Sequence, residues 1–272
     1  MSLKINSIIL FLVSSLLFPL TVYSSEQLLI SGCSVSYVGY LRDLANEYEK
    51  RTGVKVFVRG GGSVGGLENL KQGSADLAAT CRGPIGDEGA NKDFIQVAWD
   101  ALVFIVHKTN PIDNITLDNA KDIFMGRITN FKQIGGKKEE IKVFIGRTVR
   151  SIQGVEASLR QMLLNGKEPV EGPNVKIFPT GGMVEQIIEK TPDGFAASGF
   201  TSARKRDLKM LKVNGVSPTR ENIKSKKYPM QRPLFFSVLK NPPDKVKKFV
   251  DFALGLEGQK FISSIGAMPV SD

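Results

Sequence analysis

The sequence predicts an α/β protein of two compact regions, each a mainly parallel sheet flanked by helices. Three observations support this. Short β-rich runs that end in Gly, Ser or Thr repeatedly precede helix-like segments. After the long apolar strand ALVFIVHK a loop begins at Thr109, and the same unit then returns. The 272 residues, 42% of them hydrophobic, can bury one large core or two moderate ones.

The N-terminal segment has the pattern of a secretory signal peptide. Lys4 precedes an apolar run from Ile8 to Val22, and small residues follow at Ser24 and Ser25. This run is shorter than the roughly 20 residues that a membrane-spanning helix needs. We therefore expect residues 1–24 to be removed and the chain to be exported without stable membrane insertion.

A second interpretation of the N-terminus is a lipoprotein. Ile30-Ser31-Gly32-Cys33 is similar to a bacterial lipoprotein processing box, which would place a lipid on Cys33. Glu26 and Gln27 interrupt the apolar run before this box, and QLLISG has the composition of a first strand. We therefore favour the signal peptide.

The first predicted region contains three strands that each run into a loop rich in small residues. Helix-like segments follow the first two loops. In chain order, strands 28–32, 54–60 and 75–80 lead into loops 33–36, 61–64 and 81–84, and helices are expected over 37–53 and 65–73.

The second region and the tail repeat this organisation. The expected elements are a helix over 117–126, strands over 140–147, 175–180 and 193–200, helices over 152–166 and 183–191, and a final strand and helical segment over 232–240 and 244–266. The tail is too small to fold alone, so we expect it to return to the first region. The predicted domains are residues 25–108 with 232–272, and residues 109–231.

The charge balance indicates an anionic partner. The formal net charge is +10 and the pI is near 9.5. The basic residues are scattered, and no pattern of interleaved aromatic and basic residues typical of RNA binding is present. An exported protein meets little nucleic acid, so small anions are the better interpretation.

The loops that follow the predicted strands form a candidate anion site. Ligands of open parallel sheets bind outside the carboxyl ends of the strands. There the unpaired N–H groups of a helix N-terminus attract anions, and glycine lets the backbone approach closely. The candidate loops are Cys33 to Ser36, Gly60 to Gly65, Thr80 to Pro84, Arg147 to Ser151 and Thr180 to Gly182.

Side chains in these loops can add donors. The hydroxyl groups of Ser34, Ser63 and Ser151 are donors, and Arg82, Arg147 and Arg150 supply positive charge and planar geometry for a tetrahedral oxyanion. The alternative is that Gly and Ser only cap helices and make turns. The recurrence of such loops in both regions favours the anion site.

Catalysis finds little support in the sequence. His107 is the sole histidine and closes a strand, where a structural role is expected. No metalloprotease, serine-hydrolase or nucleotide-binding motif occurs, and the loop GGGSVGG lacks the lysine of a phosphate loop. We expect no enzyme activity, cofactor or metal.

An ordered series of motifs resembles the periplasmic phosphate-binding protein family. The similar runs are SGCSVSYVGYLRDLANEYEKRTGVKV, GGGSVGGLENLKQGSADLAAT, IVHKTNPIDNITLDNAKDIFMGRITNF, YPMQRPLFF and FALGLEGQKFISSIGAMPV. The resemblance implies the type II two-lobed periplasmic-binding-protein fold, a ligand cleft between the lobes, and delivery of phosphate to an ABC permease. A monomer is expected. A membrane sensor kinase is the alternative partner.

The resemblance also assigns ligand-binding residues. Ser34 and Val35 match the first anion loop, Ser63 the second, and Cys81 with Arg82 the third, while Arg147 and Ser151 match the arginine and serine of the loop in the other lobe.

This chain departs from the family pattern in two of these loops. Ile152 and Gln153 replace Gly-Thr after Ser151, and Arg150 is an added charge. The third loop reads ATCRGP, whereas phosphate binders often have a carboxylate there, which can accept the proton of monohydrogen phosphate, and other relatives have Ser-Arg. Sulfate, molybdate and other oxyanions therefore remain alternatives to phosphate.

Cys33 and Cys81 are the chain's two cysteines, and both follow predicted strands of the first region. Three interpretations stay open. They form a disulfide, which an exported protein can retain. They form a dithiol that captures a thiophilic species such as arsenite. They are small residues without a further role.

Overall fold

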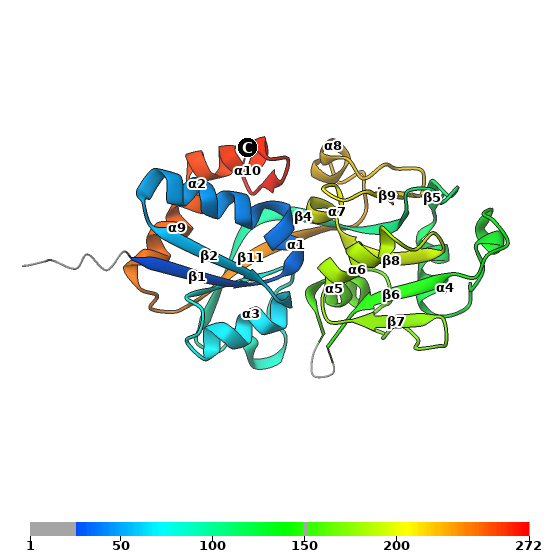
Figure 1. Ribbon diagram of the computed structural model, residues 1–272, viewed down its shortest axis with the longest axis horizontal. Coiled ribbons are helices and arrows are strands. Elements are labelled where there is room, and N and C mark those ends of the chain that lie inside the picture. The colour runs from blue at the N-terminus through cyan, green and yellow to red at the C-terminus, as the bar shows by residue number, and fades with distance from the viewer. Residues whose placement is uncertain (1–25, 149–151, 272) are drawn as a thin grey trace, which may run out of the picture.

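The computed structural model describes residues 26–148 and 152–271. Two lobes lie side by side and are joined by extended strands, as Figure 1 shows. The strands are β1 (Gln27–Gly32), β2 (Lys55–Gly60), β3 (Leu77–Thr80), β4 (Lys92–His107), β5 (Asn114–Ile115), β6 (Lys142–Gly146), β7 (Val175–Phe178), β8 (Gly194–Gly199), β9 (Leu208–Met210), β10 (Lys212–Val213), β11 (Gln231–Leu239) and β12 (Met268–Pro269). The predicted signal peptide, residues 1–24, and the predicted ligand-binding residues Arg150 and Ser151 lie outside these ranges.

Helices cover the sheet in both lobes. In the first lobe α2, α9 and α10 lie on one side of the strands and α3 on the other (Figure 1). The helices are α1 (Ser34–Ser36), α2 (Arg42–Thr52), α3 (Gly62–Lys71), α4 (Leu117–Phe124), α5 (Gly154–Met162), α6 (Gly181–Ile188), α7 (Phe200–Ala203), α8 (Arg220–Lys224), α9 (Asp244–Leu254) and α10 (Leu256–Ser264). A π-helical turn η1 (Tyr37–Leu41) and two 3₁₀ turns, η2 (Gly86–Gly89) and η3 (Phe131–Ile134), complete them.

The strands follow the order β2-β1-β3-β11-β4-β8-β6-β7. In the first lobe β1 runs parallel to β2 and β3, and in the second lobe β6 runs parallel to β7 and β8. Strand β4 is antiparallel to β11 as far as Ala101 and antiparallel to β8 from Leu102. One strand therefore belongs to both lobes, and the predicted α/β class is confirmed.

The helical run from Ser34 to Thr52 shows how the sequence specifies these elements. Leu41, Leu44 and Tyr48 recur at helical spacing and are buried against the first lobe's sheet. Gly53 ends the run in a left-handed conformation with φ of 76°, which glycine adopts without a steric penalty. The opposite end of the run begins directly after β1, so it points toward the boundary between the lobes.

Aromatic clusters fill the core on each side of the crossing strands. Phe104, Phe124 and Phe195 meet in the second lobe with ring centroids 5.4 to 6.3 Å apart. In the first lobe Tyr48 contacts the ring of Phe249 at 5.1 Å. Each lobe thus has its own packed centre. No helix in the described ranges combines the length and apolar character needed to cross a bilayer.

Candidate functional site

The N-termini of four helices meet where the lobes face each other. Helices α1 and α3 belong to the first lobe, and α5 and α6 belong to the second. The contacts between them are short, because three of the four helices begin with glycine. Helix N-termini carry unpaired N–H groups and partial positive charge. This boundary is therefore the place where the fold concentrates anion-attracting groups.

Ser34 and Val35, predicted as the first anion loop, bridge the two lobes. The hydroxyl group of Ser34 accepts a hydrogen bond from the Gly182 N–H in α6 at 3.0 Å. Val35 is buried against the end of β8, where a Cβ built on Gly199 would lie 2.4 Å from the valine Cγ1 atom. The start of α1 is thus seated directly on the second lobe.

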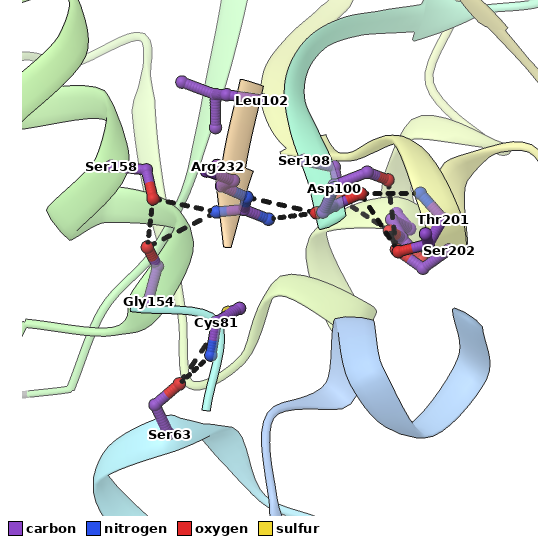
Figure 2. A network of polar contacts seen from close by, with 12 residues as sticks. Ser63, Cys81, Asp100, Leu102, Gly154, Ser158, Ser198, Thr201, Ser202 and Arg232 are labelled. Atoms are coloured by element: carbon purple, nitrogen blue, oxygen red, sulfur yellow. Dashed lines mark hydrogen bonds and ion pairs between the residues drawn. The ribbon is translucent and has the colours of Figure 1, made fainter. Parts of the chain in front are cut away.

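Ser63 and Cys81 form the second contact between the lobes. The Ser63 Oγ atom accepts the Cys81 N–H at 3.3 Å and lies 3.7 Å from the Cys81 Sγ atom. Figure 2 shows both side chains below the start of α5. A Cβ built on Gly154 would lie 2.3 Å from the Cys81 Sγ and 2.9 Å from the Ser63 Oγ atom. Only glycine fits at this position in the observed arrangement.

Gln153 is a site residue to which the sequence analysis assigned no role. Its side chain is buried, and neither its Nε2 nor its Oε1 atom has a hydrogen-bond partner within the described residues. The amide lies against Gly62 at the start of α3, where a built Cβ would be 2.3 Å from the Gln153 Oε1 atom. An unpaired buried amide is costly unless a ligand satisfies it. The signal in the sequence was the departure from Gly-Thr at this position.

Two of the predicted arginines, Arg82 and Arg147, are held by carboxylates. Arg82 is buried, donates to Glu88 Oε1 at 2.8 Å and to the Gly83 carbonyl oxygen at 2.9 Å, while its Nε atom has no partner in the described part of the chain. Arg147 donates to both oxygens of the buried Glu156 at 2.9 and 3.0 Å. The hydrogen bond with Glu156 raises the pKa of Arg147. Their positive charges are therefore largely compensated.

A buried ion pair that sequence reasoning missed lies beside the site. Arg232 of β11 donates to Asp100 Oδ2 of β4 at 2.8 and 3.1 Å, and to the Ser158 Oγ of α5 at 3.0 Å (Figure 2). Asp100 Oδ1 accepts from the N–H and hydroxyl of Thr201 at 2.9 and 3.0 Å. The pair ties the two crossing strands to α5 and α7. Arg232 occurs in the motif YPMQRPLFF, but its partner lies 132 residues away.

The two cysteines are free and buried in the first lobe. Burial raises the pKa of the Cys33 thiol, whereas hydrogen bonding to Cys33 lowers the pKa of the Cys81 thiol, helped by the positive charge of Arg232. The two side chains are therefore direct neighbours with unequal acidity. Within residues 26–148 and 152–271, no group of three or more His, Cys, Asp and Glu residues forms a candidate metal site.

A groove of about 760 Å³ opens beside Cys81 and is lined by both lobes. Its walls include Arg82 of the first lobe, Ile152 and Ser158 of the second, and Arg232 of the crossing strands. The groove thus reaches the boundary at which the helix N-termini meet, and it provides a path from solvent to the Cys81 side of the site.

Comparison with known proteins identifies the family. The profile of the PBP superfamily domain matches residues 23–257. The phosphate-binding protein PstS of Borreliella burgdorferi is 30% identical over 98% of this chain and 99% of its own length. The protein of the same name from Bacillus subtilis is 26% identical over 92% of this chain and 82% of its own length.

Solved structures give the same result. The crystal structure of a putative phosphate ABC transporter substrate-binding protein from Clostridium perfringens, with bound phosphate, has a TM-score of 0.80 and 26% identity over 90% of this chain and all of that one. An ABC-type phosphate transport receptor from Vibrio cholerae matches with a TM-score of 0.66 and 26% identity over 89% of this chain and 99% of that one. The predicted two-lobed fold is therefore confirmed, and the chain belongs to the PBP superfamily, within the family of the PstS phosphate-binding proteins.

Proposed function

We propose that this chain is an exported, periplasmic solute-binding protein that captures phosphate between its lobes for an ABC importer. The two similar relatives are named phosphate-binding proteins, and the similar structure from Clostridium perfringens contains bound phosphate. The family consists of binding proteins, which agrees with the expectation that the chain is not an enzyme. Of the ligands left open by the sequence, these relatives favour phosphate over sulfate, molybdate and arsenite.

The meeting of helix N-termini from both lobes is the observation that carries this proposal. Ser34 contacts Gly182, and Ser63 with Cys81 contacts Gly154, so groups from both lobes meet along one boundary. The unpaired amide of Gln153 adds donors there. A phosphate ion held between these groups would replace its hydration shell with backbone and side-chain donors.

The proposed ligand contacts combine backbone dipoles with a few side chains. They come from Ser34, Val35, Ser63, Cys81, Arg82, Arg147, Arg150 and Ser151, together with Gln153. Glu88 and Glu156 compensate the charges of Arg82 and Arg147. We therefore assign most of the attraction to the N-termini of α1, α3 and α6, whose first turns carry no acidic residue, whereas the first turn of α5 carries Glu156.

Closure of the lobes would report the bound ion to the membrane partner. We propose residues 25–108 with 232–272 as one lobe and residues 109–231 as the other, with a hinge in the strands that pass between them. The protein acts as a monomer that delivers phosphate to a permease; sedimentation or light scattering of the mature chain tests the monomer, and cell fractionation tests the periplasmic location.

Calorimetric titration of residues 25–272 tests the ligand. Phosphate is expected to bind, with sulfate, molybdate, arsenate and arsenite as competitors, each measured with and without a reductant. X-ray scattering should show compaction when phosphate is added. Binding of arsenite alone, and only in reduced protein, would overturn the proposal in favour of a thiol-based sensor.

A matched pair of serine variants tests the site. Ser63→Ala removes a buried hydroxyl group at the lobe boundary, so phosphate affinity should fall by about tenfold, the usual effect of losing a hydrogen bond to a charged group. Ser264→Ala is the control, because it removes an exposed hydroxyl group of α10. This hydroxyl group donates to the carbonyl oxygen of Phe261 at 2.8 Å. Equal affinities of the two variants would contradict the site assignment.

A further inference from the structure

Cys33 and Cys81 become neighbours because the strands before them pair. Gly32 at the end of β1 lies opposite Ala79 of β3, and the Cys33 N–H donates to the Ala79 carbonyl oxygen at 2.7 Å. Cys81 follows β3 directly, so the two cysteines stand at the adjacent carboxyl ends of two paired strands. Both side chains are almost wholly enclosed, with 3% and 1% of their surface exposed. Cys81 contacts Ser63, so the pair lies directly beside the proposed phosphate site.

We propose that Cys33 and Cys81 are a reversible redox modification site. A small-molecule disulfide of the glutathione type converts the two thiols into an intramolecular disulfide, and this disulfide weakens anion capture. The effect on affinity rests on the proposed function, whereas formation of the disulfide does not. An exported protein meets conditions in which such a bond forms and persists.

The reaction balances through two exchanges. The Cys81 thiolate attacks a sulfur atom of the glutathione disulfide, which forms a mixed disulfide and releases one glutathione thiolate. Cys33 then loses its proton and attacks the Cys81 sulfur atom, which releases the second glutathione. The protein loses two electrons and two protons, and the glutathione disulfide gains the two electrons. Cys81 reacts first because its pKa is lowered and because it lines the groove.

The geometry links this reaction to the position of the lobes. In the closed arrangement the Cys81 Sγ atom lies beside Ser63 and directly under Gly154 of the second lobe. A covalent bond to Cys33 constrains this sulfur atom and so alters its contacts with Ser63 and Gly154, and it also constrains the start of α1, which Cys33 directly precedes. Conversely, the start of α5 lies against the Cys81 sulfur atom, since a Cβ built on Gly154 would be 2.3 Å from it, and only 1% of Cys81 is exposed although it lines the groove. Separation of the lobes therefore speeds the reaction of this thiol with a reagent.

The first experiment measures disulfide formation. Reduced residues 25–272 are incubated with glutathione disulfide, with and without phosphate, and the products are followed by mass spectrometry and by titration of free thiols after denaturation. The expected product has lost two hydrogen atoms and both free thiols. Phosphate should slow its formation at least tenfold. Retention of both thiols after prolonged incubation without phosphate would overturn the proposal.

The second experiment measures phosphate affinity in both redox states. The oxidised protein is expected to bind at least tenfold more weakly than the reduced protein. Reciprocity then requires phosphate to shift the dithiol–disulfide equilibrium by the same factor, about 30 mV for each tenfold change in affinity. Equal affinities of the two forms would refute the coupling. Failure of the reduced protein to bind phosphate at all would instead contradict the proposed function.

Single-cysteine variants separate the two steps. Cys33→Ser cannot complete the second exchange, so the mixed disulfide with glutathione should accumulate on Cys81. In Cys81→Ser the remaining buried thiol should stay unmodified, and the phosphate affinity of this variant should be the same before and after incubation with the disulfide. Accumulation of glutathione on Cys33 instead would contradict the assigned order of attack.

Discussion

Gly154 is the position at which the boundary between the lobes has no space for a side chain. A Cβ atom there would lie 2.3 Å from the Cys81 sulfur and 2.9 Å from the Ser63 hydroxyl oxygen. Both neighbours are buried and fixed by the backbone of the first lobe. The Gly154→Ala change should therefore oppose closure of the two lobes on each other, and it should leave the internal packing of each lobe unchanged.

The size of the effect follows from the overlap. The lobes must separate by about 1 Å at this point to restore ordinary contact distances. Overpacking of this kind costs about 1 to 3 kcal/mol. If phosphate binds to the closed form, its affinity should fall by about fivefold to about 150-fold. The ligand-free protein should be no less stable, because alanine favours a helix more than glycine does.

Calorimetry of phosphate binding and thermal unfolding without phosphate measure these two effects separately. Gly65→Ala is the matched control, because Gly65 also lies near the N-terminus of a helix, α3. Nothing stands within 4 Å of a Cβ atom built on Gly65. This control should keep the wild-type affinity. A Gly154→Ala variant that binds phosphate as tightly as Gly65→Ala would refute the argument that the observed closure is the binding conformation.

Three further changes test charges around the boundary. Arg232→Ala leaves Asp100 buried without its partner, so urea unfolding should show a loss of about 3 to 5 kcal/mol, and Arg232→Lys should lose less. Burial raises the pKa of Glu185, so its folded form holds a proton more tightly than its unfolded form. Stability should therefore fall relative to Glu185→Gln as the pH rises above the ordinary glutamate pKa, and parallel pH profiles would contradict this. Lys205 of the second lobe pairs with Asp43 of the first at 2.7 Å in a partly exposed bridge, so Lys205→Ala should weaken phosphate binding by at most about fivefold, and high salt should remove the difference.

Local patterns in the sequence determined the elements and the position of the candidate site. Hydrophobic periodicity identified β1 and α2 within a few residues of their observed ends, because burial on one face imposes that period. It placed the start of β4 at Ala101, whereas the strand begins at Lys92, and it did not separate α9 from α10. Glycine and serine after the strands indicated helix N-termini. The structure then placed Ser34 against Gly182 and Ser63 against Gly154, at the boundary where the parallel strands of both lobes end.

Contacts between residues far apart in the chain were decided only by the tertiary structure. The sequence offered Arg82 and Arg147 as open donors, and folding pairs them with Glu88 and Glu156. It gave Arg232 no role, because its partner Asp100 comes from a different crossing strand.

The cysteines show the same division between sequence and fold. The sequence determined that Cys33 and Cys81 each follow a strand of the first lobe. That the two cysteines stand side by side depends on β1 lying next to β3 with Gly32 opposite Ala79. Strand order and register arise from packing of the whole sheet, and local composition does not encode them.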